Sequence, residues 1–115
     1  MAEKRTYRMV TIFNAKEGME DEFNDWYSNH HMPQALKVPG MKTGQRFRLA
    51  EHQRPGSTPQ WKYLAYYEVE TDDLEGLLAE IKSREGTPAL VSTTTIEPGG
   101  SVMVFEPITE KITSD

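Results

Sequence analysis

Two adjacent histidines, His30 and His31, give this sequence its clearest potential for chemistry. An imidazole has an unperturbed pKa of about 6.5, so near neutral pH it can either accept or donate a proton. Trp26 precedes His30 by four residues, and Tyr27 precedes His31 by four. This spacing brings two side chains together on one side of a helix. The segment therefore predicts a general acid or base beside aromatic rings.

Which histidine faces a cavity is left open by the residues alone. Helical periodicity favours His30, because it lies at the centre of an apolar stripe at 100° per residue. The stripe consists of Met19, Phe23, Trp26 and His30, with Tyr27 at its edge. Pro33 disfavours the α conformation at the preceding residue, so we expect the regular helix to end or kink near His31. The histidine that does not face the cavity would cap the helix or pack in the core.

Other candidate ligand-binding side chains come from the strands. Three tyrosines are expected on one face of a sheet, below the aromatic helix, where they either line an apolar pocket with their hydroxyl groups or simply pack in the core. These residues are Tyr7, Tyr63 and Tyr67. Arg46 is a candidate for orienting an anionic substrate or enolate, and an ion pair with Glu68 on a neighbouring strand is the alternative.

Alternating apolar residues predict four strands, and apolar stripes at helical spacing predict two helices. The expected strands cover residues 6–14, 41–49, 62–70 and 102–108, and the helices cover residues 19–31 and 74–85. Residues 87–100 form a polar loop that is too long to be only a connector. The order β-α-β-β-α-β predicts an α+β, ferredoxin-like fold with two helices on one face of a four-stranded antiparallel sheet. Bulky residues on both faces of the strands indicate that the other face is an interface.

The totals exclude several classes of protein. A chain of 115 residues fits one domain, covering residues 1–115. With no cysteine there is no disulfide, thiolate nucleophile or zinc–thiolate site. A net charge of −5 argues against nucleic acid and anionic membranes as partners. Adjacent helical histidines point about 100° apart, so we expect no metal site. We expect a cytoplasmic protein, because no secretory or membrane-spanning segment is evident.

Three short motifs carry a resemblance to a known family. They are Trp26-Tyr27 followed by His31-Met32-Pro33, then Val38-Pro39-Gly40, then Gln45-Arg46-Phe47. Together they resemble EthD-type proteins of the dimeric α/β-barrel (ferredoxin-like) superfamily. The resemblance implies a homodimer formed by two sheets packed face to face, and it points to His31, the histidine two residues before the proline. That superfamily includes isomerases, polyketide cyclases, monooxygenases and haem proteins. A haem ligand would be expected on the second helix, which has no histidine, so we expect no cofactor.

These observations predict a small cofactor-independent enzyme of the isomerase, cyclase or lyase type. It would use histidine acid–base chemistry on an apolar small molecule that contains a carbonyl or a lactone. Two alternatives stay open at this point. One is a non-catalytic ligand-binding or accessory protein with the same pocket, and the other is a monooxygenase that works without metal or flavin.

Overall fold

A computed structural model describes residues 3–115 of the chain. Its elements follow the predicted order, and their bounds differ from the predicted ones mainly at the last strand and within the first helix. The strands are β1 (Arg5–Phe13), β2 (Met41–Arg48), β3 (Tyr63–Thr71) and β4 (Ser101–Phe105), and the helical segments are α1 (Glu20–Trp26), η1 (Tyr27–His31), α2 (Met32–Ala35) and α3 (Leu74–Arg84).

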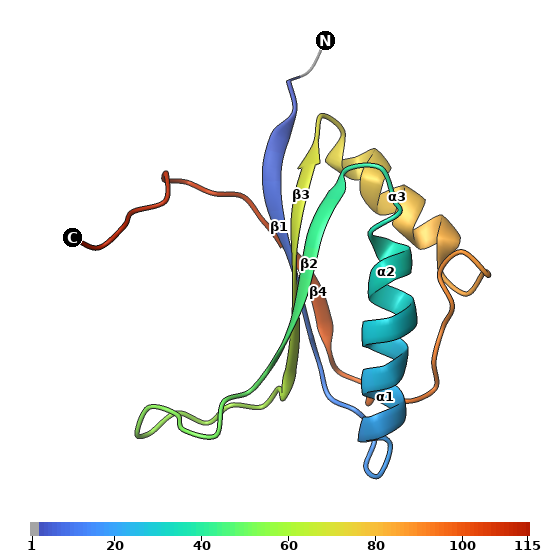
Figure 1. Ribbon diagram of the computed structural model, residues 1–115, viewed down its shortest axis with the longest axis vertical. Helices are drawn as coiled ribbons and strands as arrows, with labels where there is room; N and C mark the ends of the chain where they lie inside the picture. The colour runs from blue at the N-terminus through green and yellow to red at the C-terminus, as the bar shows by residue number, and fades with distance from the viewer. Residues whose placement is uncertain (1–2) are drawn as a thin grey trace.

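The four strands form one antiparallel sheet in the order β2-β3-β1-β4. All helical segments lie on the same face of this sheet, and the other face is bare (Figure 1). β1 and β3 form the centre of the sheet. β1 pairs with β3 over its whole length and with β4 along its other edge. The α+β, ferredoxin-like fold predicted from the element order is confirmed.

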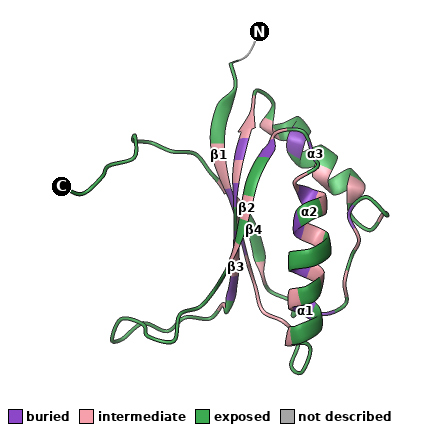
Figure 2. Ribbon diagram, in the orientation of Figure 1, coloured by how far each residue is buried: buried purple, intermediate pink, exposed green. Residues whose placement is uncertain are grey.

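The core lies between the sheet and the helices, where purple residues face one another in Figure 2. Alternate residues of β1 and β3 point into it, because side chains of a strand alternate between the two faces. Aromatic and aliphatic side chains from the helices complete it. The largest fully buried side chains are Tyr67, Phe23, Leu90, Val38 and Val69.

The first helix contains a π-helical turn, η1, which sequence periodicity did not predict. The amide of Met32 donates to the carbonyl of Tyr27, five residues earlier, and α-helix resumes with Pro33 in its first turn. A proline within a regular α-helix would clash with the carbonyl four residues before it, and a wider turn relieves that clash. The regular α-helix therefore ends at Trp26 rather than near His31, but the helical path continues to Ala35.

The extra residue of the π turn changes which histidine faces inward. Phe23 and Tyr27 are buried, and His31 continues that side of the helix, whereas the side chain of His30 is 57% exposed. The prediction that His30 lies at the centre of the apolar stripe is therefore wrong. It assumed 100° per residue throughout, and a π turn advances each residue by a smaller angle.

The bare face of the sheet carries exposed apolar side chains, as the strand patterns predicted. Phe47 of β2, Tyr66 of β3 and Phe105 of β4 are all exposed there. Two segments extend beyond the sheet on this side, the loop between β2 and β3 and the chain after β4 (Figure 1). The latter contains Ile108 and Ile112, which are 94% and 88% exposed. The predicted last strand ends early, at Phe105, before Pro107.

Candidate functional site

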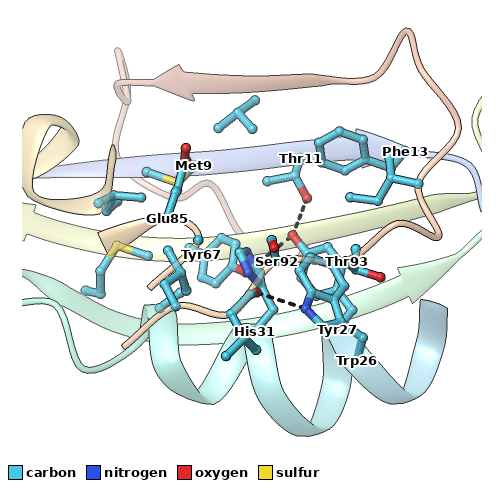
Figure 3. Close-up of a pocket in the computed structure, with 18 of the residues that line it drawn as sticks. Met9, Thr11, Phe13, Trp26, Tyr27, His31, Tyr67, Glu85, Ser92 and Thr93 are labelled. Carbon is cyan, nitrogen blue, oxygen red and sulfur yellow. Dashed lines mark hydrogen bonds between the residues drawn. The ribbon is translucent and has the colours of Figure 1, made fainter. Parts of the chain in front are cut away.

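A cavity of about 380 Å³ lies between the sheet, the helices and the loop that follows α3. Figure 3 shows His31, Trp26, Tyr27 and Tyr67 around it. Its walls are mostly apolar, with a few hydroxyl groups, one imidazole and one carboxylate. The lining residues are Met9, Thr11, Phe13, Trp26, Tyr27, His31, Ala35, Met41, Tyr67, Leu78, Ile81, Glu85, Gly86, Leu90, Val91, Ser92, Thr93, Ile96 and Val102.

His31 reaches this cavity from the π turn. Its ring lies against the indole of Trp26, with centroids 4.6 Å apart, and meets the ring of Tyr27 edge-on at 4.9 Å. Its Nδ1 atom is buried and has no hydrogen-bond partner. Burial disfavours the charged imidazolium and lowers the pKa of His31 to about 4. At neutral pH the ring is therefore uncharged, and its buried Nδ1 makes no hydrogen bond.

Three hydroxyl groups meet next to His31, from the helix and from two strands. The hydroxyls of Tyr27 and Thr11 lie 2.7 Å apart, and the hydroxyl of Tyr67 donates to that of Tyr27 over 3.4 Å. Dashed lines in Figure 3 mark both contacts. Burial raises the pKa of Tyr27 and the pKa of Tyr67, so both phenols stay protonated and can donate. The cluster supplies neutral hydrogen-bond donors in a largely apolar space.

The loop after α3 closes one wall of the cavity and is held by the first helix. Trp26 Nε1 donates to the carbonyl of Val91 over 3.0 Å. The side chain of Gln34 donates to the carbonyl of Pro88 and accepts from the amide of Val91, at 3.1 and 2.9 Å. These bonds fix the loop against the helix, so the wall is part of the folded structure.

Arg46 does not line the cavity. Its guanidinium lies on the far side of Tyr27, 4.7 Å from the centre of that ring, and it donates to Ser28 Oγ over 2.8 Å and to Asn24 Oδ1 over 2.9 Å. The predicted ion pair with Glu68 is wrong, because Arg46 faces the helices. Arg8 of β1 takes that place, 3.6 Å from the Glu68 carboxylate.

The remaining predicted residues are divided between the cavity and its surroundings. Tyr63 is buried beside Phe23 and lines a second, smaller pocket together with Arg46. Tyr7 lies farther along β1, outside the cavity lining. His30 lies on the surface, with Nε2 3.7 Å from the carboxylate of Asp25. Of the eight predicted site residues, the structure thus brings four to the cavity, namely Trp26, Tyr27, His31 and Tyr67.

Several cavity residues were not predicted as site residues. Thr11 was assigned only to a strand, although its hydroxyl is the closest partner of Tyr27. Glu85 and Ser92 also line the cavity. The unusual length of the 87–100 loop indicated that it does more than connect two elements, and residues of this loop do line the cavity. Nothing in the sequence indicated where the loop would pack.

Neither a metal site nor a haem ligand is evident in this lining. Within residues 3–115, no three side chains of His, Asp or Glu gather as metal ligands would. The imidazole of His31 is packed between aromatic rings, and α3 contributes only Leu78 and Ile81 to the cavity. These residues do not fit a haem held by a histidine of the second helix. No helix in the described part of the chain is long and apolar enough to span a membrane.

The fold and cavity define a ferredoxin-like α+β protein with an internal ligand-sized space, and comparison with known proteins agrees. No family model and no curated protein sequence matches the chain. An EthD-like protein from Ralstonia eutropha JMP134 matches with a TM-score of 0.64 and 14% identity, covering 93% of this chain and 96% of that chain. An EthD family protein from Bacillus halodurans C-125 matches with a TM-score of 0.59 and 18% identity, covering 90% and 99%.

A third similar structure is a variant of MhuD with two manganese protoporphyrin IX molecules bound per active site. It has a TM-score of 0.61 and 14% identity, covering 93% of this chain and 99% of that chain. The resemblance to EthD-type proteins inferred from the motifs is thus confirmed as a likeness of fold. One fold hosts many activities, so function has to be argued from the cavity itself.

Proposed function

We propose that the chain is a small enzyme, of the isomerase, cyclase or lyase type, that needs no cofactor and acts on an apolar molecule with a carbonyl or lactone group. The observation that supports this most is the uncharged imidazole of His31 in the lining of an apolar cavity. A perturbed titratable group at a cavity is typical of catalytic sites. The cavity also suits a ligand of this kind in size and polarity.

In this proposal His31 is the proton acceptor. A C–H bond next to the substrate carbonyl breaks, its proton joins the imidazole, and the electron pair forms an enolate. The neutral phenol of Tyr27, which bonds to Thr11 and Tyr67, would donate a hydrogen bond to the developing enolate oxygen. The imidazolium then returns the proton to the same or another carbon, which gives exchange or isomerisation.

The low pKa of His31 restricts the substrate further. A base whose conjugate acid has a pKa of about 4 is weak, so it removes only protons that are already acidified by neighbouring groups. The same imidazolium is a strong acid when the proton is returned. We therefore expect substrates such as unsaturated lactones, in which one C–H is activated by both a carbonyl and a double bond.

Deuterium exchange tests this function directly. Five-membered unsaturated lactones would be incubated with the protein in D₂O and followed by NMR. We expect catalysed exchange that falls about 10²–10⁴-fold in His31→Gln, the usual contribution of a general base. The exposed His30→Gln variant is the matched control and should keep its rate. Exchange that survives in His31→Gln would refute the proposed role of His31.

A second candidate function is ligand binding without catalysis. It is favoured by the hydroxyl cluster, in which Thr11, Tyr27 and Tyr67 already satisfy one another without a substrate. Saturable binding of a lactone with no exchange above background would support this candidate. No cavity residue specifically supports the third possibility, a cofactor-free monooxygenase.

We also propose that a second copy of the chain covers the bare face of the sheet. Exposed apolar side chains such as Phe47 and Phe105 form part of that face, and a homodimer would remove them from water. Light scattering at micromolar concentration should give twice the mass of 13.2 kDa. The Phe47→Glu variant should shift the protein toward monomer, and a wild-type monomer would rule the dimer out.

A further inference from the structure

The cavity has very few ionisable side chains in its lining. Of its lining residues only Glu85 has an acidic side chain and none has a basic one, since burial keeps His31 neutral and the two tyrosines protonated. The remaining polar lining side chains are small hydroxyls such as Ser92 and Thr93. Glu85 is therefore the one carboxylate that a ligand in this cavity can meet.

The backbone of Glu85 is held at the end of α3. Its amide donates to the carbonyl of Ile81 over 3.2 Å. Gly86 then turns the chain with a φ of 78°, a value suited to glycine. The amide of Gly86 donates to the carbonyl of Leu90 over 2.9 Å, which ties this turn to a buried residue of the cavity wall. Glu85 is itself exposed, so it lies at the rim of the cavity.

No basic side chain in the described part of the chain pairs with this carboxylate. The adjacent Arg84 is directed at Glu80, with Nε 3.1 Å from the carboxylate of that residue. None of the ion pairs formed within residues 3–115 includes Glu85. In Figure 3, Glu85 lies toward one end of the cavity and Phe13 toward the other, with His31 between them. A ligand that extends from His31 to this end of the cavity would meet the carboxylate of Glu85.

We propose that Glu85 determines which ligands the cavity accepts. It selects apolar molecules whose outer end carries a hydrogen-bond donor, a hydroxyl or an amine, and it excludes carboxylates. A carboxylate accepts hydrogen bonds but donates none, so Glu85 can bond to a hydroxyl or an amine of a ligand, whereas a ligand carboxylate meets only a like charge. This inference deepens the proposed function, because it adds the chemistry of the substrate's outer end to that of its reacting end.

The test uses Trp26, which lines the cavity, as a fluorescent reporter in a Trp61→Phe background. Three probes share one phenylpropyl frame and end in an ammonium, a carboxamide or a carboxylate. We expect the ammonium and carboxamide probes to bind at least 10-fold more tightly than the carboxylate. In Glu85→Gln this preference should fall below about 3-fold, and in Glu85→Lys the carboxylate should bind best. Glu75→Gln, near the start of α3 and outside the cavity lining, should keep the wild-type order.

The outcomes separate this inference from the proposed function. Equal affinity for the three probes, or a preference unchanged in Glu85→Gln, would overturn selection by Glu85 and leave the exchange chemistry of His31 untouched. If none of the probes changed the emission of Trp26 or the melting temperature, the cavity would not be a ligand site and both proposals would fail. Loss of exchange in His31→Gln with normal probe selection would support both.

Discussion

The imidazole of His31 lies against the indole of Trp26, with ring centroids 4.6 Å apart and planes inclined by 31°. This contact brings a titratable ring next to a natural fluorophore. It also shields the imidazole from water, together with the edge-on ring of Tyr27. The charge of the His31 imidazole can therefore be followed through the fluorescence of Trp26, without a substrate.

The first prediction uses that signal. In a Trp61→Phe variant Trp26 is the only tryptophan of the chain, and its emission should change as the neighbouring imidazole gains a proton. Because burial lowers the pKa of His31 to about 4, the midpoint should lie near pH 4. The change should disappear when His31→Gln is added. A midpoint near 6.5 would show that the ring is not buried as described.

The second prediction concerns stability and pH. His31 has a folded-state pKa of about 4 and an unfolded one of about 6.5. Between these values the unfolded chain binds more protons, so the free energy of unfolding should decrease as the pH falls from 6.5 to 4. The loss from this residue is at most about 3.5 kcal/mol, at about 1.4 kcal/mol per pH unit.

Urea unfolding at pH 7, 5.5 and 4 measures this dependence. Carboxylates titrate in the same range, so the comparison is made with His31→Gln, which keeps every carboxylate. The difference between the two proteins isolates the contribution of the imidazole. Parallel curves for the two proteins would contradict the prediction.

The third prediction concerns the pair of hydroxyls formed by Thr11 and Tyr27, which are 2.7 Å apart. Removing one partner leaves the other with fewer bonds in a buried place, so Thr11→Val and Tyr27→Phe should each cost about 1–3 kcal/mol of unfolding free energy. The double variant should cost less than the sum, by about 0.5–3 kcal/mol. Tyr67→Phe is a useful comparison, because its contact is longer and should be worth less. Strict additivity would show that the two hydroxyls do not interact.

The fourth prediction concerns Arg46, which joins β2 to the first helix. Its guanidinium lies over the rings of Tyr27 and Tyr63 and bonds to Ser28 and Asn24. Arg46→Met should lower the free energy of unfolding by about 1–3 kcal/mol, through lost cation–π contact and lost hydrogen bonds. Arg46→Lys should recover only part, because lysine lacks the planar fork. Full recovery with lysine would mean that charge alone matters.

Much of the fold could be predicted because alternation and helical spacing are local signals. The strands around Met9 and Tyr67 were recognised in this way, and the β-α-β-β-α-β order then limits the topology. The inward position of His31 was suggested by the EthD resemblance and by its spacing from Tyr27. Sequence periodicity gave the opposite answer, because it cannot register a π turn.

Contacts between distant segments could not be predicted in the same way. Thr11 and Tyr27 are on different elements, and their partnership depends on how the helix lies on the sheet. The position of the loop depends on two bonds of Gln34, a residue that looked unremarkable in the sequence. Glu85 could not be distinguished from other surface carboxylates until its place at the rim was known.

The π turn at Tyr27–His31 also bears on how this chain should be aligned with others. A π turn arises when a helix gains one residue while the turns on either side keep their positions. A related chain without that residue would have a continuous α-helix, and its inward histidine would come one position sooner after the aromatic pair. Alignments should therefore place a single gap between Tyr27 and His31, since without it His30 would be matched to the cavity histidine of the relative.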